Sequence, residues 1–152
     1  MYLTQLRPND VGAIKRWPSY PGELSDLDYA LRSGGWLDEF PESETNHRYG
    51  GWVEDELIGF SVLNETGHGK AEFYVAIHPD KVGLGFGKIL TQLIIMKGFQ
   101  ELHLNTIYLR VRIWHKRAIN VYERIGFRKL CEVDSNIHGR AVRVYVMEIH
   151  GS

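Results

Sequence analysis

Three glycines, Gly83, Gly85 and Gly87, alternate with other residues in the stretch KVGLGFGKIL at residues 81–90. Inside a helix or strand each glycine costs about 0.5–1 kcal/mol relative to alanine, so three together indicate a loop whose backbone must stay bare. Such loops often lead into a helix N-terminus, where unpaired N–H groups and the positive end of the helix dipole bind an anion such as a phosphate. A flexible turn before a core helix is the alternative, and this stretch alone does not choose between them.

The hydrophobic pattern on both sides of the loop predicts strands alternating with helices. Strand-like alternation and β-branched runs predict strands at residues 1–7, 47–53, 57–63, 71–77, 106–113, 127–134 and 140–149, the last two joined by a turn at 135–139. Helix-like spacing predicts two short helices at 8–17 and 22–32, a long helix from Lys88 and a fourth at 115–125 that Gly126 stops. Residues 34–46 are polar and turn-rich, which predicts a loop.

The element order is therefore β-α-α-β-β-β-α-β-α-β-β, which predicts an α/β (α+β) fold with a mixed sheet. A chain of 152 residues is long enough for one core, so we expect a single domain over residues 1–152. The glycine loop follows a predicted strand and precedes the longest helix. That position favours anion binding over a casual turn.

Charge and composition disfavour several classes of partner. Lys and Arg number 18 against 19 Asp and Glu, so the electrostatic attraction of a basic chain to nucleic acid is absent. The first residues lack the pattern of a signal peptide, and no apolar run is long enough to span a bilayer, so we expect no membrane partner and a cytoplasmic location. Cys131 is the sole cysteine, which excludes an intramolecular disulfide and a thiolate metal cluster, and we expect no bound metal.

Two common phosphate-binding motifs do not fit the glycine loop. A P-loop has the form G-x-x-x-x-G-K-[ST], whereas here Gly83 and Gly87 are one residue too close and Ile89 follows Lys88 where a hydroxyl residue is needed. A dinucleotide fingerprint has the form G-x-G-x-x-G, whereas these glycines give G-x-G-x-G. A protein that binds ATP or NAD through this loop is therefore disfavoured.

Two segments together resemble a known family. AIHPDKVGLGFGKIL (residues 76–90) is similar to the acetyl-CoA-binding motif Q/R-x-x-G-x-G/A of the GCN5-related N-acetyltransferases, the GNAT family, here at Val82 to Gly87. RVRIWHKRAINVYERIGFRKL (residues 110–130) resembles the second signature of that family, a strand, a helix with A-I-x-x-Y-E and then G-F. The resemblance covers roughly residues 47–149 and implies the GNAT fold with acetyl-CoA as the acetyl donor.

The resemblance also implies a mode of cofactor binding. In this family the fourth strand diverges from the fifth, and the pantetheine arm pairs with backbone in the opening like an added strand. Val75, Ala76 and Ile77 are implied to form that edge. The pyrophosphate is implied to bind the backbone N–H groups of the loop, where a side chain would hold the oxygens away. The loop residues implied in this role are Gly83, Leu84, Gly85, Phe86, Gly87 and Lys88, and Val82, the first residue of the motif, is implied to bind the cofactor beside them.

Two positions in these motifs depart from the family pattern. Val82 stands where the family usually has Gln or Arg, so a polar contact to the cofactor is missing, for which Lys81 could compensate. His115 stands where the family commonly has Asn, and it is implied to contact the cofactor arm, with a capping or surface histidine as the alternative. Arg117 and Asn120 on the same predicted helix are expected at the surface.

Two residues are candidates for catalysis. Tyr122 matches the family's tyrosine that protonates the departing CoA thiolate, with a core aromatic as the alternative. The acceptor ammonium must also lose a proton, and Glu72 is the candidate base, with Tyr74 and His78 on its face by alternation. A glutamate that merely faces solvent is the alternative. In some family members an acid on the fifth strand serves as base, but Arg110 holds that place here.

The resemblance predicts an acetyl-CoA-dependent N-acetyltransferase that moves an acetyl group to a primary amine by direct attack in a ternary complex. A CoA-binding sensor or regulatory module of the same fold, catalytically weak or inactive, is the alternative that the departures at Val82, His115 and Arg110 favour. The acceptor is expected to be a small-molecule or peptide amine, and exposed strand edges would permit a homodimer.

Acidic and aromatic side chains near residue 40 are candidates for contacts with a cationic acceptor. Carboxylates in this loop could attract an ammonium, although such clusters are usually just solvated. The acidic residues are Asp38, Glu39, Glu42 and Glu44. Aromatic side chains could line an acceptor pocket, with a core role as the alternative. The aromatic residues are Trp36, Phe40, Trp52 and Trp114.

Overall fold

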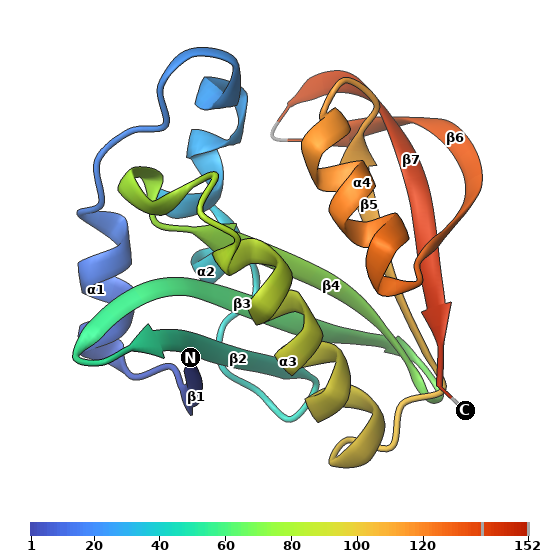
Figure 1. The fold of residues 1–152 in the computed structure, drawn as a ribbon, viewed down its shortest axis with the longest axis horizontal. Helices are drawn as coiled ribbons and strands as arrows, with labels where there is room; N and C mark the ends of the chain where they lie inside the picture. The colour runs from blue at the N-terminus through green and yellow to red at the C-terminus, as the bar shows by residue number, and fades with distance from the viewer. Residues whose placement is uncertain (138, 152) are drawn as a thin grey trace.

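The computed structural model describes residues 1–137 and 139–151, and within them one mixed sheet of seven strands in the order β1-β2-β3-β4-β5-β7-β6 (Figure 1). The strands are β1 (Tyr2–Gln5), β2 (Asn46–Val53), β3 (Glu56–Gly67), β4 (Lys70–Ile77), β5 (Thr106–Arg112), β6 (Arg128–Ile137) and β7 (Arg140–His150). The α-helices are α1 (Pro8–Lys15), α2 (Trp36–Glu39), α3 (Phe86–Gln100) and α4 (Lys116–Ile125), and the 3₁₀ helices are η1 (Gly22–Leu31) and η2 (Pro79–Lys81). The predicted mixed α/β fold is confirmed. The turn predicted between the last two strands includes His138, which lies outside the described residues.

Two segments ahead of β2 differ from the sequence prediction. The second predicted helix is the 3₁₀ helix η1, and the short helix α2 lies inside the predicted loop. Arg32, just after η1, reaches back to the carboxylate of Asp28 with nitrogen to oxygen distances of 2.9 Å. Arg48 of β2 donates to the carbonyl oxygens of Leu37 and Phe40, which are the groups that a helix C-terminus leaves unpaired. The Asp28–Arg32 pair is a local i, i+4 contact, whereas Arg48 reaches carbonyls 8 and 11 residues away in another element, which local spacing could not predict.

The parallel strands β4 and β5 pair over only part of their length. Register pairs join Lys70 to Thr106, Ala71 to Ile107 and Glu72 to Tyr108, and none follows them. Beyond Glu72, β4 continues beside β3 and β5 continues beside β7. Figure 1 shows the two strands leaving a common end and diverging. The sheet therefore opens at its centre, between elements that are each held firmly on their other side.

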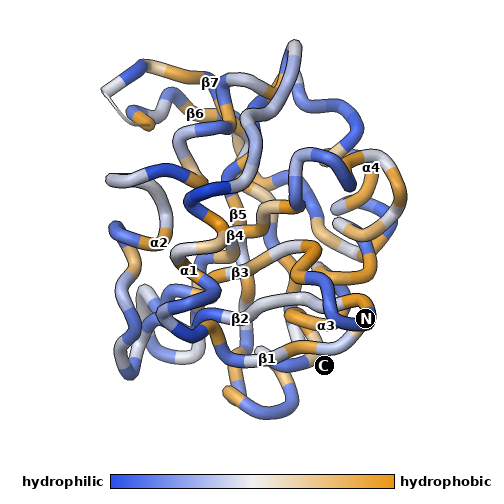
Figure 2. Tube along the Cα trace, turned by 90° about the vertical axis from the view of Figure 1, so that its left-hand side faces the viewer, coloured by the Kyte–Doolittle hydropathy of each residue, from blue (hydrophilic) through white to orange (hydrophobic). Residues whose placement is uncertain are grey.

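Helices cover both faces of this sheet, and each face has its own core. One cluster joins α3 and α4 to the sheet through residues such as Leu90, Ile94 and Ile119, while the other joins α1 and η1 to it through Ile14 and Leu31. Figure 2 shows α1 and α2 on one side of the stacked strands and α3 and α4 on the other. In the described residues no helix is long and apolar enough to cross a membrane.

Gly98 allows α3 to lie close to the sheet. A Cβ atom at this position would lie 2.9 Å from Cδ1 of Ile107, 3.2 Å from Leu104 and 3.3 Å from Leu63, all of them in the core. We expect Gly98→Ala to lower the free energy of unfolding by about 1–3 kcal/mol, because the clash outweighs the gain in helix propensity. Urea denaturation measures the change.

Gly12→Ala is the matched control, because the same substitution in α1 meets only the flexible end of Arg16 at 3.4 Å. It should raise the free energy of unfolding by about 0.5–1 kcal/mol through helix propensity alone. A Gly98→Ala protein as stable as the Gly12→Ala protein would contradict the close approach of α3 to the sheet.

Candidate functional site

Two adjoining cavities occupy the opening between β4 and β5. The loop cavity, of about 410 Å³, is lined by the glycine loop, the end of β4 and the first turns of α4. The sheet cavity, of about 380 Å³, is lined by the diverging parts of β4 and β5, by η1 and α2, and by the end of β6. The two cavities share lining residues, so a ligand in one can touch a ligand in the other. The shared residues are Leu27, Trp36, Val75, His115, Ala118 and Tyr122.

The glycine loop has the geometry that its sequence predicts. Gly83 and Gly85 have φ angles of +84° and +89°, a left-handed conformation that residues with a side chain rarely adopt. Gly85 is the N-cap of α3, and no side chain caps this end of the helix. The first N–H groups of α3 are thus open to an anion. Leu84 is 65% exposed and does not line the loop cavity, whereas Gly83, Gly85 and Lys88 do.

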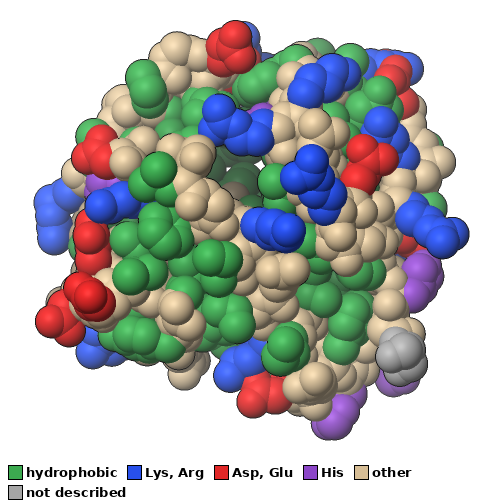
Figure 3. All heavy atoms as spheres, viewed as in Figure 1, with side chains coloured by type: hydrophobic (Ala, Val, Ile, Leu, Met, Phe, Trp, Pro, Cys, Tyr) green, Lys and Arg blue, Asp and Glu red, His purple; other side chains and the backbone are tan. Residues whose placement is uncertain are grey.

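Cationic side chains surround the mouth of the loop cavity. Lys81, Lys88 and Arg117 line it, and Figure 3 shows a hollow with Lys and Arg side chains around it between the start of α3 and α4. Nη1 of Arg117 lies 3.2 Å from the position that a Cβ atom at Gly83 would take. The sequence predicted Arg117 at the surface. It is exposed, but the packing of α4 beside the loop turns its guanidinium toward the glycines.

Residues 75–77 form the open edge of β4. The N–H of His78 and the carbonyl of Tyr74 both bond toward β3. Backbone groups alternate along a strand, so Val75 and Ile77 direct theirs into the opening while Ala76 faces β3. Ala76 still lines the loop cavity, as do its two neighbours. Of the three predicted edge residues, two therefore offer backbone groups to a ligand.

Tyr20 closes one end of this open edge. Its hydroxyl donates to the carbonyl of Ile77 at 2.5 Å, and its ring lines the loop cavity. Burial, and next the charge of Asp28, raises the pKa of Tyr20 well above its usual value, so the hydroxyl keeps its proton. The sequence prediction missed Tyr20, because nothing in its neighbourhood along the chain links it to β4.

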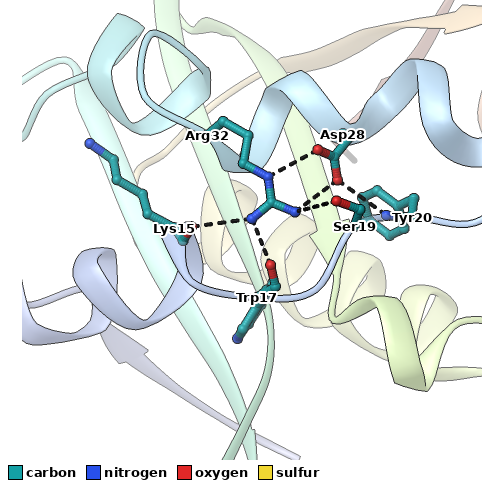
Figure 4. Close-up of polar contacts among 6 residues, drawn as sticks. All are labelled: Lys15, Trp17, Ser19, Tyr20, Asp28 and Arg32. Carbon is teal, nitrogen blue, oxygen red and sulfur yellow. Dashed lines mark hydrogen bonds and ion pairs between the residues drawn. The ribbon is translucent and has the colours of Figure 1, made fainter.

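A network around Arg32 positions Tyr20, as Figure 4 shows. Asp28 accepts from the backbone N–H of Tyr20 at 3.1 Å and from Arg32. Arg32 also donates to the carbonyl oxygens of Lys15 at 3.1 Å and Trp17 at 2.6 Å. One guanidinium thus fixes η1 against the end of α1. The segment between them, which carries Tyr20, is held over the opening.

Tyr122 lies where the two cavities join. It comes from α4, and its ring contacts Phe73 and Phe127 edge-on, at centroid distances of 6.5 and 5.7 Å. Burial raises the pKa of Tyr122 to about 12, so the phenol is protonated throughout the neutral range. No hydrogen bond joins its hydroxyl to another residue in the part of the chain that the structure describes. The proton is therefore free for transfer to a ligand.

His115 precedes α4 and lines both cavities. Burial lowers its pKa, and the charges of Arg117 and Arg112 lower it further, so the imidazole is neutral at pH 7. A neutral imidazole has one donor and one acceptor nitrogen and can make the same kinds of hydrogen bond as an asparagine side chain. Trp114 stacks on it with a centroid distance of 5.1 Å.

Glu72 is buried at the floor of the sheet cavity and is paired. Its Oε2 accepts from Nε of Arg110 at 2.6 Å, and Arg110 also donates to Ser135 and to the Tyr74 hydroxyl. Burial and the charge of Glu72 raise the pKa of Tyr74 well above its usual value. His78, predicted on the same face, packs against Trp17 at a centroid distance of 4.8 Å, in the core cluster that Tyr74 also joins, and lines neither cavity.

The acidic loop only partly reaches the site. Asp38 pairs with Lys15 and Glu42 accepts from Gln5, so both are engaged elsewhere. Glu39 alone of the four predicted carboxylates lines the sheet cavity. No group of His, Cys, Asp or Glu side chains suited to a metal ion occurs within the described ranges.

Of the predicted aromatic residues, some line the cavities and others lie away from them. Trp36 lines both cavities, and Phe40 packs behind it on Tyr74 at a centroid distance of 4.6 Å. Trp52 lies away from the opening, where it stacks on Tyr2 near the sheet edge. Trp114 is partly exposed beside His115. One of the four is therefore placed to touch a ligand directly.

The lowered pKa of His115 predicts a pH dependence of stability. A histidine binds protons more readily unfolded than in this site, so stability is full above the unfolded pKa of about 6.5 and falls as pH drops below it. The fall in melting temperature between pH 7.5 and pH 5 should be smaller for His115→Asn than for the native protein. His103→Asn, in an exposed loop, is the control and should change nothing. Equal falls in all three proteins would contradict the buried neutral imidazole.

Comparisons with known proteins agree with this geometry. A spermidine N(1)-acetyltransferase of Vibrio cholerae is 38% identical over 80 residues, which make up 49% of this chain and 46% of that protein. The Escherichia coli K12 spermidine N(1)-acetyltransferase is 29% identical over 132 residues, 83% of this chain and 66% of that protein. The matches thus span about half to two thirds of the length of these relatives.

Solved structures show the same fold over nearly the whole chain. A chimera of the V. cholerae spermidine N-acetyltransferase has a TM-score of 0.78 at 26% identity, covering 99% of this chain and 96% of that one. The V. cholerae enzyme in complex with CoA and spermine has a TM-score of 0.76 at 25% identity, covering 98% and 94%. A family model described as the acetyltransferase (GNAT) family matches residues 14–127. Because that match includes both the glycine loop and the helix of Tyr122, this chain belongs to the GNAT acetyltransferase family.

Proposed function

We propose that this protein is an acetyl-CoA-dependent N-acetyltransferase that acetylates a primary amine by direct attack in a ternary complex. The observation that carries the proposal is the junction of the loop cavity and the sheet cavity at Tyr122. Two ligands that enter from opposite ends of the opening meet there, beside a protonated phenol. Direct transfer between two bound substrates needs such a junction, because the reacting atoms must come within about 3–3.5 Å.

The loop cavity is the proposed donor site. The pyrophosphate binds the N–H groups of residues 83–88 at the start of α3, with Lys88 and Arg117 adding charge. Val82, Leu84 and Phe86 have apolar side chains, so these three residues contribute backbone contacts rather than polar side-chain contacts. The pantetheine arm runs along the open edge of β4, where the backbone of Val75 and Ile77 supplies hydrogen bonds in the manner of an added strand. His115 faces the same arm from the other wall.

The chemistry follows from the groups at the junction. The acceptor nitrogen loses a proton and forms a bond to the thioester carbonyl carbon. As the C–S bond breaks, the nitrogen loses its second proton and the sulfur takes the proton of Tyr122, which solvent then restores. A phenol with a pKa of about 12 stays protonated at any pH where the reaction runs. Tyr122 thus has a proton to donate and is the proposed acid, so that the thiol leaves neutral.

Glu72 remains the proposed base. One carboxylate oxygen is bound to Arg110, so a water molecule in the sheet cavity carries the ammonium proton to it. The acceptor is a primary amine that enters beside Trp36 and Glu39. Polyamines are the substrates in the names of the relatives. A cytoplasmic location and pairing of copies through β1 or β6, the two edges of the described sheet, stay predictions.

Ligand-induced stabilisation tests the donor site. Acetyl-CoA or CoA at about 100 times its dissociation constant should stabilise the fold by about 2.7 kcal/mol, which raises the melting temperature by about 5–10 °C. ATP and NAD at the same concentration should raise the melting temperature less.

Arg117→Ala should weaken CoA binding about 10-fold, because it removes a charge beside the glycine loop. The control, Lys116→Ala, changes the neighbouring exposed residue, which lines neither cavity, and should bind CoA normally. Equal stabilisation by ATP, NAD and CoA would contradict the proposed donor.

Tyr122→Phe tests the proposed acid. Loss of a positioned general acid should lower kcat by about 10²-fold or more, while the dissociation constant of acetyl-CoA stays within about 2-fold. The measurement is the release of CoA thiol in the presence of an amine panel, together with calorimetric titration of acetyl-CoA. Tyr145→Phe, on β7 outside both cavities, is the matched control. Unchanged turnover in Tyr122→Phe would remove the phenol from the mechanism.

A further inference from the structure

Arg112 is a buried cation in the wall of the sheet cavity. It is the last residue of β5, it is only 7% exposed, and it lines the cavity together with Arg110 from the same face of the strand. Removing a guanidinium from water is costly, and proteins normally offset the cost with a carboxylate partner. Arg110 follows this rule through Glu72 at 2.6 Å.

Arg112, by contrast, has no carboxylate partner. Among residues 1–137 and 139–151, no carboxylate lies within 4.0 Å of its guanidinium. Its polar neighbour is the hydroxyl of Tyr29, whose pKa is raised by burial, with the Arg112 charge and a hydrogen bond from Arg112 opposing the rise. Arg48 Nε is the one fully enclosed side-chain nitrogen or oxygen without a partner in the described chain. The Arg112 side chain lines the sheet cavity and also a smaller cavity that Asp26 and Arg140 line, and Asp26 there pairs with Arg140.

The charges that remain in the sheet cavity are of opposite sign. Glu72 and Arg110 neutralise each other, which leaves Glu39 and Arg112 among its Asp, Glu, Lys and Arg residues. Both act on Tyr29, since the charge of Glu39 raises the pKa of its hydroxyl and that of Arg112 lowers it. A polyamine carries only positive charge, so Arg112 would repel it and would still lack a carboxylate partner.

We propose, building on the proposed acetyltransferase function, that the acceptor is an amine that also carries a carboxylate, and that Arg112 and Tyr29 bind this carboxylate. A carboxylate suits the guanidinium, which can donate two parallel hydrogen bonds to it. The donor phosphates do not take this place, because the glycine loop, Lys88 and Arg117 line the other cavity and Arg112 does not. The amine then points toward Tyr122 at the junction.

Matched pairs of acceptors test the proposal. Lysine and cadaverine differ only by a carboxylate, as do ornithine and putrescine, and tyrosine and tyramine. Release of CoA thiol and the mass of the product give kcat/KM for each compound, with spermidine as a further comparison. In at least one pair the carboxylate should raise kcat/KM by about 10- to 100-fold, the effect expected of a charge-assisted contact in a buried site.

Variants of Arg112 separate binding from folding. Arg112→Gln should abolish the preference for the carboxylate member of each pair, and Arg112→Lys should retain part of it. Because the native guanidinium is buried without a carboxylate partner, Arg112→Gln should melt at the same temperature as the native protein or higher. Arg143→Gln is the control, since Arg143 lies on β7, pairs with Glu132 and Asp134, and lines neither cavity.

Each outcome either supports or overturns the proposal. A carboxylate preference that disappears in Arg112→Gln and survives in Arg143→Gln supports the proposal. Equal or better use of the diamines by the native protein, or a preference that persists in Arg112→Gln, overturns it while leaving the acetyltransferase function intact. A fall of several degrees in the melting temperature of Arg112→Gln also overturns it, because the arginine would then be structural. Stabilisation by CoA with no acetylation of any compound overturns both the carboxylate assignment and the proposed activity.

Discussion

The open edge between β4 and β5 is the constraint on which the rest of the site depends. Backbone groups buried without a partner cost about 1–3 kcal/mol each, so an unpaired strand edge in a protein core needs other donors and acceptors. Tyr20 supplies one, at the carbonyl of Ile77. The remaining groups stay available to a ligand that runs along β4. The glycine loop begins just beyond this strand, so one extended ligand can reach both the edge and the start of α3.

Charge distinguishes the two ends of the opening. The loop cavity is lined by Lys81, Lys88 and Arg117 and by no carboxylate of the described residues, which suits a phosphate ligand. The sheet cavity neutralises one arginine with Glu72 and leaves Arg112 without such a partner. Between them lies Tyr122, whose pKa is raised by burial alone. Because the residues that the two cavities share are largely apolar, charge differences at the two ends act more strongly there than they would in bulk water.

The sequence predicts those parts of the site that follow from local pattern. The glycine loop, the helix after it and the strand order all follow from spacing, and two motifs at the expected separation identify the family. The sequence prediction did not find the roles of Tyr20, Arg117 and Arg112, because their functions arise from packing between elements distant along the chain. Tyr20 lies 57 residues from its partner on β4. In the sequence Arg112 resembles any polar strand residue, and its burial depends on the neighbouring strand β7 and on Tyr29 of η1. The pairing of Glu72 with Arg110 was likewise not predicted, because sequence alone does not show that these two residues lie next to each other.

A structure of the protein with bound CoA would test the central claim most directly, that one ligand joins the glycine loop to Tyr122 through the opening of the sheet. The account predicts the pyrophosphate on the N–H groups of residues 83–88, the arm along Val75 and Ile77, and the sulfur within hydrogen-bonding reach of the Tyr122 hydroxyl. A pyrophosphate bound away from this loop, or a thiol outside the junction of the two cavities, would contradict it.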